Sequence, residues 1–202
     1  MLNCWFWTQD ENDKARVKDD AWVRYLSGSD SAYPVRELQK AFGTIRSKVA
    51  GMRADTTTPD TRLADDPMKY NPATVQTLNK LMMAGLDPGR GAAPLHCRLR
   101  YFDPINRRAG IPEDVAALIH SISDHEVSVT LVNLNQSNPR ELIVQAGAYG
   151  EHKVTEIQMG DQSLRVDNSN FQVTLALGSG ARLVIKNDRY AVQPTMSFPL
   201  MK

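Results

Sequence analysis

The stretch EVSVTLVNLNQSNPRELIVQAGAY, residues 126–149, decides the fold of this chain. Its odd positions from 127 to 131 are apolar and the even positions between them carry hydroxyls, which is the alternation of a strand with one buried face. Asn, Gln, Ser and Pro at 135–139 supply turn chemistry, and an apolar run restarts at 142–144. The pattern predicts a β-hairpin. Because an isolated hairpin is marginal in water, further strands must cover it.

The chain after this stretch continues as short β-segments. Apolar alternation and intervening turns predict strands at 126–134, 140–148, 152–159, 162–167, 170–177 and 181–187. The sequence LGSGA at 177–181 predicts a hairpin turn between the last two strands. Short antiparallel strands at this spacing are typical of a β-sandwich.

The chain before this stretch is mostly helical in pattern. Residues 10–26 predict one helix, and an apolar stripe with spacings of three and four predicts a second helix from Pro34 to about Gly51. A third helix is predicted from Asn71 to Gly85, with Asn71 as its cap. Residues 95–102 (LHCRLRYF) alternate as a strand, and 112–122 predict a short helix.

These elements together predict an α+β fold. The expected division is a helical segment at 1–94, with a long acidic loop at 54–70, followed by a connector and an antiparallel β-sandwich domain at 95–202. The apolar stripes of the helices need a cover, so the two parts are expected to pack together.

Composition indicates a soluble globular protein and excludes several classes. The formal charge is +1, with 42% hydrophobic and 23% charged residues, so nothing draws the whole chain to nucleic acid. No apolar run approaches a membrane span, and no secretory signal is visible; the compartment is not indicated. Cys4 and Cys97 have no metal-site spacing and are expected to be free thiols, with one disulfide left open.

Candidate ligand-binding residues fall in two places. The acidic loop offers Asp60, Arg62, Asp65 and Asp66, and the polar side of the strand at 95–102 offers His96 and Arg98. Such groups could bind a polar or anionic ligand if they converge. The simpler interpretation, which we favour, is turn chemistry in the loop and a solvated or salt-bridged face on the strand. The four histidines show no helical metal-site spacing, and no metal or cofactor is predicted.

Clustered aromatic residues mark the N-terminal region: Trp5, Phe6, Trp7, Trp22 and Tyr25. Such a cluster is more often packed in a core than displayed as a sugar-stacking platform. It also suggests an upstream domain or partner chain that packs on the N-terminus.

Two segments, VTLVNLNQSNPRELIVQAGAYGEH (129–152) and VTLALGSGARLVIKNDRYAVQPTMSFP (173–199), resemble the C-terminal β-sandwich of large bacterial multidomain proteins, including carbohydrate-active ones. The preceding LHCRLRYFDPINRRAGIPEDVAALI (95–119) is similar to the connector into such a sandwich. The resemblance implies a chain that belongs to a longer protein, and it brings no catalytic residues.

No catalytic motif occurs in the sequence, so the expected function is that of a non-catalytic accessory or interaction region of a larger protein, with a carbohydrate relation implied by the resemblance. Two alternatives remain. One is an enzyme acting on a saccharide or other polar substrate through the loop 54–70 and the face of His96 and Arg98. The other is a sugar-binding module that uses exposed tryptophans.

Overall fold

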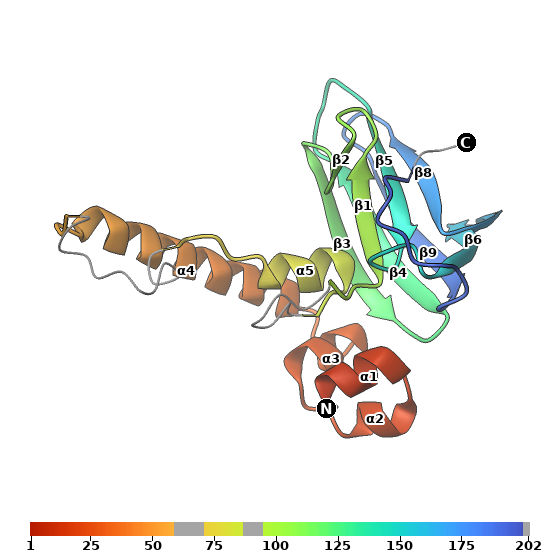
Figure 1. Ribbon diagram of the computed structural model, residues 1–202, viewed down its shortest axis with the longest axis horizontal. Helices are drawn as coiled ribbons and strands as arrows, with labels where there is room; N and C mark the ends of the chain where they lie inside the picture. Colours follow the sequence, from red (N-terminus) through yellow and green to blue (C-terminus); the bar gives the residue numbers. More distant parts are fainter. Residues whose placement is uncertain (59–70, 87–94, 200–202) are drawn as a thin grey trace.

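The computed structural model describes residues 1–58, 71–86 and 95–199. A helical region precedes two stacked antiparallel sheets (Figure 1), which confirms the predicted α+β class. The described helices are α1 (Leu2–Thr8), α2 (Glu11–Ala15), α3 (Ala21–Leu26), α4 (Tyr33–Ala54) and α5 (Gln76–Met83).

The single helix predicted at 10–26 is wrong, because two aspartates each begin a separate short helix. The Asp10 carboxylate accepts hydrogen bonds from the backbone amides that open α2, and the Asp20 carboxylate accepts those of Trp22 and Val23 at the start of α3. A side-chain acceptor before a helix satisfies amides that have no partner within the helix. Asp20 therefore caps a new helix, α3, after the turn that ends α2.

The long helix α4 confirms the strongest helical pattern of the sequence. It runs for 22 residues with a proline in its first turn, where a missing amide costs nothing. The third predicted helix is shorter than expected: α5 begins at Gln76 rather than Asn71. The Asn71 side chain instead accepts from the amide of Ala73 in a local turn, a frequent use of asparagine outside helices.

The two sheets contain the nine strands of the described residues. They are β1 (Leu99–Asp103), β2 (Arg108–Ala109), β3 (Val115–Ile122), β4 (Glu126–Asn133), β5 (Arg140–Ala146), β6 (Lys153–Met159), β7 (Gln162–Asn168), β8 (Asn170–Leu175) and β9 (Gly180–Asp188). One sheet has the order β2-β1-β5-β8 and the other β3-β4-β9-β6-β7.

The predicted hairpin at 126–149 is wrong in its pairing, although both of its strands exist. β4 pairs with β3 and β9, whereas β5 pairs with β1 and β8 in the opposite sheet. The turn at 177–180 is likewise not a hairpin turn, since β8 and β9 also lie in different sheets. Alternation and turn residues specify a reversal of the chain, and they do not distinguish side-by-side pairing from stacking across a core.

The helix predicted at 112–122 is wrong: this segment is β3. Val115 and Ile119 are buried as the helical spacing suggested, but the chain is extended and pairs with β4. The apolar residues 115, 118, 119 and 122 fit a helix and a strand buried on both faces equally well. Pairing with β4 and packing under α3 and α5 decide the outcome.

The helical region and the sandwich share one apolar core. Trp5 and Trp22 are 2% and 1% exposed and meet edge to face at 6.1 Å between ring centroids. The hydroxyl of Tyr25 donates to the carbonyl of Ile119 on β3 at 2.7 Å, and that of Tyr101 on β1 donates to Met82 of α5 at 2.6 Å. The two parts therefore pack together, as their apolar stripes predicted.

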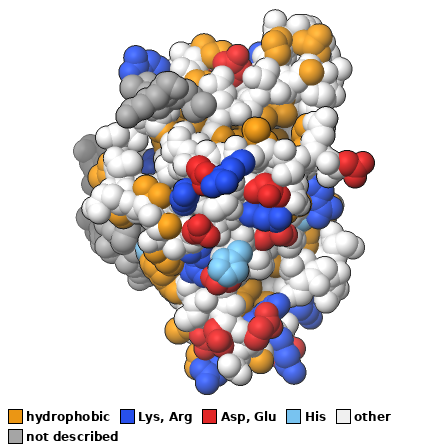
Figure 2. All heavy atoms as spheres, turned by 90° about the vertical axis from the view of Figure 1, so that its right-hand side faces the viewer, with side chains coloured by type: hydrophobic (Ala, Val, Ile, Leu, Met, Phe, Trp, Pro, Cys, Tyr) orange, Lys and Arg blue, Asp and Glu red, His pale blue; other side chains and the backbone are white. Residues whose placement is uncertain are grey.

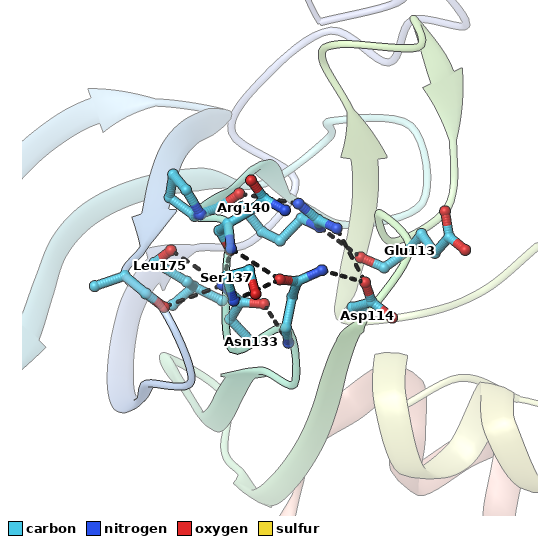
Figure 3. A network of polar contacts seen from close by, with 10 residues as sticks. Glu113, Asp114, Asn133, Ser137, Arg140 and Leu175 are labelled. Atoms are coloured by element: carbon cyan, nitrogen blue, oxygen red, sulfur yellow. Dashed lines mark hydrogen bonds and ion pairs between the residues drawn. The ribbon is translucent and has the colours of Figure 1, made fainter.

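Two of the turns that cross between the sheets, the one after β4 and the one after β8, are tied together by the side chain of Asn133, which is 1% exposed (Figure 3). Its amide nitrogen donates to Asn138 O at 2.9 Å in its own turn and to Ala176 O at 3.0 Å in the other. A third contact, at 3.4 Å, reaches the carbonyl of Leu175. Outside this centre, Arg140 and Asp114 form an ion pair at 2.9 Å. A buried donor facing several carbonyls at once fixes how the sheets stack.

Replacement of Asn133 tests this arrangement. We expect Asn133→Leu to lower the free energy of unfolding by about 1–3 kcal/mol, because buried carbonyls then lose their donor. Asn133→Asp should cost at least as much at neutral pH, since a carboxylate would face those carbonyls. Urea unfolding measures both. Asn138→Ala, at an exposed side chain of the same turn, is the control and should stay within about 0.5 kcal/mol of the wild type.

Candidate functional site

The structure tests only part of the predicted ligand-binding set. Asp60, Arg62, Asp65 and Asp66 lie outside the described residues, so their convergence with the other members stays a prediction. His96 and Arg98 are described, and they lie where β1 meets the N-terminal helices.

The face around Arg98 was predicted to be solvated or salt-bridged, and the solvated alternative is wrong, because Arg98 is 2% exposed. Its backbone amide donates to Met83 O at the end of α5, and its carbonyl accepts from Gly147 N after β5. These bonds place Arg98 between the helical region and the sandwich rather than on an open strand. Cys97 is also buried, whereas Cys4 is exposed, and both are free thiols.

Arg98 belongs to a group that we call the basic junction: Arg98, His152 and Arg189, together with Asp124. The guanidinium of Arg189 pairs with the Asp124 carboxylate at 2.6 Å and also donates to the carbonyl of Trp7 at the end of α1. Arg98 Nη2 reaches the backbone carbonyl of Asp124 at 3.4 Å. His152 Nδ1 accepts from the amide of Tyr190 at 3.1 Å. Both guanidinium groups thus bond to Asp124, Arg189 through the carboxylate and Arg98 through the backbone carbonyl.

Several buried polar atoms of this region have no hydrogen-bond partner within the described parts of the chain. They are Nε and Nη1 of Arg98, Nε of Arg189, and both side-chain heteroatoms of the buried Asn187. Burial, with the nearby Arg189, lowers the pKa of Arg98 to about 10. Burial, followed by the charges of Arg98 and Arg189, lowers the pKa of His152 to about 4. His152 is therefore neutral near pH 7.

The basic junction holds the N-terminal helices to the sandwich through hydrogen bonds and charge pairing. It offers donors and positive charge, which suit a carboxylate or another small anion, and Arg189 fastens the last turn of α1 to the sandwich. Among the described residues there is no cluster of three or more His, Cys, Asp or Glu that could hold a metal ion. No sequence pattern marks Asp124, Asn187 or Arg189, because they become neighbours only through the fold.

The aromatic cluster divides into a buried and an exposed part. Trp5 and Trp22 are in the core, as predicted, whereas Trp7 is 42% exposed. Trp7 lies against the ring of His96 at 4.4 Å and stacks on Tyr190 at 6.1 Å between centroids. A stacking platform would therefore rest on Trp7 and Tyr190 rather than on three tryptophans.

The most exposed apolar surface of the helical region lies on α4, which projects from the body of the molecule (Figure 1). Val35, Phe42 and Met52 are 60%, 55% and 50% exposed, and Leu38, Ile45 and Val49 are partly buried. These six residues, which we call the α4 seam, follow one another at spacings of three and four. Leu38 packs against the shared core, whereas Val35, Phe42 and Met52 are exposed. The stripe that predicted the helix is therefore only partly buried, unlike most such stripes.

Other surfaces of the molecule are less distinctive. On the side of β6 and β8, acidic and basic side chains are interleaved rather than separated by sign (Figure 2), so that face has no single-sign field for a polyanion. No helix in the described part of the chain is long and apolar enough to cross a membrane.

Comparison with known proteins found a family model that matches one part of the chain. Residues 4–81, fewer than half of the 202, match the model of a family described as a domain of unknown function, DUF8034. This match begins in α1, contains all of α4 and ends within α5. Searches of curated proteins and of solved structures found no match.

The pKa of His152 predicts how stability depends on pH. The folded state holds His152 neutral down to about pH 4, whereas the unfolded chain takes up that proton near pH 6.5. Above about pH 6.5, His152 therefore does not lower the free energy of unfolding. As the pH falls from 6.5 toward 4, the free energy of unfolding drops by about 3 kcal/mol, because only the unfolded chain binds the proton.

Chemical unfolding between pH 7 and pH 4 measures this loss. In His152→Asn, which keeps an acceptor for Tyr190 N, the free energy of unfolding should fall by about 3 kcal/mol less between pH 7 and pH 4 than in the wild type. Equal slopes for wild type and His152→Asn would contradict the assignment.

The two arginines of the basic junction should differ in their effect on stability. Arg189→Met removes an ion pair and the bond to Trp7 O, so we expect a loss of about 1–3 kcal/mol. Arg98→Met replaces a buried and poorly paired charge by an apolar side chain of similar length, and should leave stability unchanged or raise it. Thermal and urea unfolding of both variants test this contrast; a larger loss for Arg98→Met would contradict it.

Proposed function

We propose that this chain is a non-catalytic interaction region in which the α4 seam binds an amphipathic helix of a partner that is flanked by acidic residues. The observation that carries the proposal is the exposed apolar row on a projecting helix. A contiguous apolar surface of this kind typically marks a site of protein association.

The spacing of the α4 seam favours a helix as the partner. In heptad positions, Val35, Phe42 and Val49 are at a, and Leu38, Ile45 and Met52 are at d. Such a narrow a/d row is the geometry of helix-on-helix packing, whereas a helix that lies on a membrane has a wider apolar face. α5 faces the side of α4 away from the a positions, across a polar groove of about 290 Å³. The a positions are therefore not covered by α5.

The charges of α4 define the partner further. The helix carries five basic residues and one acidic residue, Glu37. Its e positions include Arg46 and Arg53, and its g positions include Lys48, which donates to Asn71 O. In a coiled pair, e and g residues of the two helices face each other. A second copy would bring like charges together, so a partner with Glu or Asp at these positions fits better.

The lack of a recognised catalytic motif in the sequence fits a non-catalytic role. The α4 seam lies within residues 4–81, the part of the chain that matches the family model. Of the residues in the enzyme alternative, His96 and Arg98 are described, and Arg98 is enclosed. The carbohydrate relation and the sugar-binding alternative stay predictions, the latter resting on Trp7.

Binding of a designed helix tests the proposal. The probe is a labelled 21-residue helical peptide with Leu at a and d and Glu at e and g; its control has Lys at e and g. We expect the acidic peptide to bind the full chain in fluorescence anisotropy, at least tenfold more tightly than the basic one, with an affinity that falls as salt rises.

Matched variants locate the contact. Phe42→Asp should weaken binding tenfold or more, whereas Ser47→Asp, which adds the same charge at an exposed f position, should not. Equal binding by both variants, or equal binding of the two peptides, would contradict the proposal. Association with anionic lipid vesicles, or a dimer in sedimentation that Phe42→Asp abolishes, would replace it by a membrane or self-association role.

A further inference from the structure

We propose a second binding site, independent of α4: the free edge of β8 and the apolar groove beside it accept an extended, uncharged peptide segment as an additional strand. Addition of a strand to a sheet edge uses backbone hydrogen bonds for affinity and pockets for alternate side chains for specificity. The β8 edge offers both.

The outer strands of the two sheets are β2, β8, β3 and β7, and three of them are protected against such pairing. β2 has two residues. α3 and α5 pack against β3, and the Tyr25 hydroxyl donates a hydrogen bond to the Ile119 carbonyl. β7 carries Arg165 and Asp167, paired at 2.6 Å. Short length, covering elements and charged residues are the usual means by which proteins block edge pairing.

β8 has none of these protections. Its sequence is NFQVTL, which contains no charged residue and no proline. It pairs with β5 on one side only. Besides the pairing with β5, the bond recorded to β8 from another described strand is that of Asn133 Nδ2 to Leu175 O, at the last residue of β8. The edge of β8 before Leu175 is therefore open for pairing.

An apolar groove of about 560 Å³ runs beside this edge. One wall is formed by Ile157, Met159, Leu164 and Leu183 of the other sheet, and the other wall by the four consecutive residues 171–174 of β8. Side chains alternate in direction along a strand. Consecutive lining residues therefore mean that the groove follows the edge of β8 rather than one of its faces.

The groove selects the chemistry of its occupant. None of its lining residues is charged, which disfavours acidic or basic ligands, and its volume lies in the range of ligand sites. An aliphatic chain would fill the groove but leave the β8 amides and carbonyls unpaired. An extended segment of about five to seven residues, apolar at every second position, satisfies both features.

A second copy of this chain fits the groove less well. The apolar residues of β8 are already used in its own core: Phe171 and Leu175 are 7% and 3% exposed, and the partly buried Val173 packs against the same core. They cannot also enter the groove of a neighbour, so pairing of two β8 edges would leave that groove unfilled. The partner is therefore a segment whose apolar side chains are not already buried.

The test uses a labelled octapeptide that alternates Val and Thr, with two lysines at one end for solubility. Its control has the same sequence with every second backbone amide N-methylated, which removes donors without removing apolar surface. In fluorescence anisotropy with the full chain, we expect the unmodified peptide to bind at least tenfold more tightly than the methylated one. Equal binding would overturn strand addition.

Variants of the edge complete the test. Gln172→Lys and Thr174→Lys place a charge at exposed positions of β8 and should each weaken binding tenfold or more. Ser137→Lys, at an exposed turn position outside the groove, should not. Phe42→Asp should leave this binding unchanged, which separates the site from the α4 seam. Unaltered binding by the β8 variants, or a dimer that Thr174→Lys dissociates, would overturn the proposal.

Discussion

The stacking of two sheets by turns that cross between them is the constraint on which this structure depends. β4 and β5 are neighbours in sequence but lie in opposite sheets, and the same is true of β8 and β9. The Asn133 side chain donates into both crossing turns from a buried position. Because a buried amide must find acceptors, this position specifies one arrangement of the two turns and disfavours the alternatives. The shared core, the sheet edges and the groove beside β8 follow from that arrangement.

The helical region takes its place from the sandwich. α3 and α5 pack on β3, and Arg189 fastens the end of α1 through Trp7 and Asp124. These contacts hold the start of α4 and leave the rest of the helix projecting (Figure 1). The two proposed binding surfaces, the α4 seam and the β8 edge, lie in different parts of the fold. Each is an apolar surface that the chain does not cover with its own described residues.

The sequence allowed the fold class to be predicted, together with most strand positions after residue 126, because alternation is a local property. Strand pairing is not local, so the hairpin at 126–149 was misassigned. The segment 112–122 was misassigned because one apolar spacing fits both a helix and a two-sided strand. Arg98 was expected on a solvated or salt-bridged face, and the fold buries it. Arg189, Asp124 and Asn187 could not have been found, since only the fold brings them together. The α4 stripe was recognised, but its exposure depends on what surrounds the helix.

The central claim is that α4 is a docking element, and hydrogen exchange tests it most directly. Exchange of the α4 amides would be measured by mass spectrometry for the full chain, alone and saturated with the acidic-flanked helical peptide. The account predicts slower exchange across residues 35–53, with the strands β4 and β5 unchanged, because partner contacts suppress local opening of the helix. Unchanged exchange in α4, or protection confined to the sandwich, would contradict it.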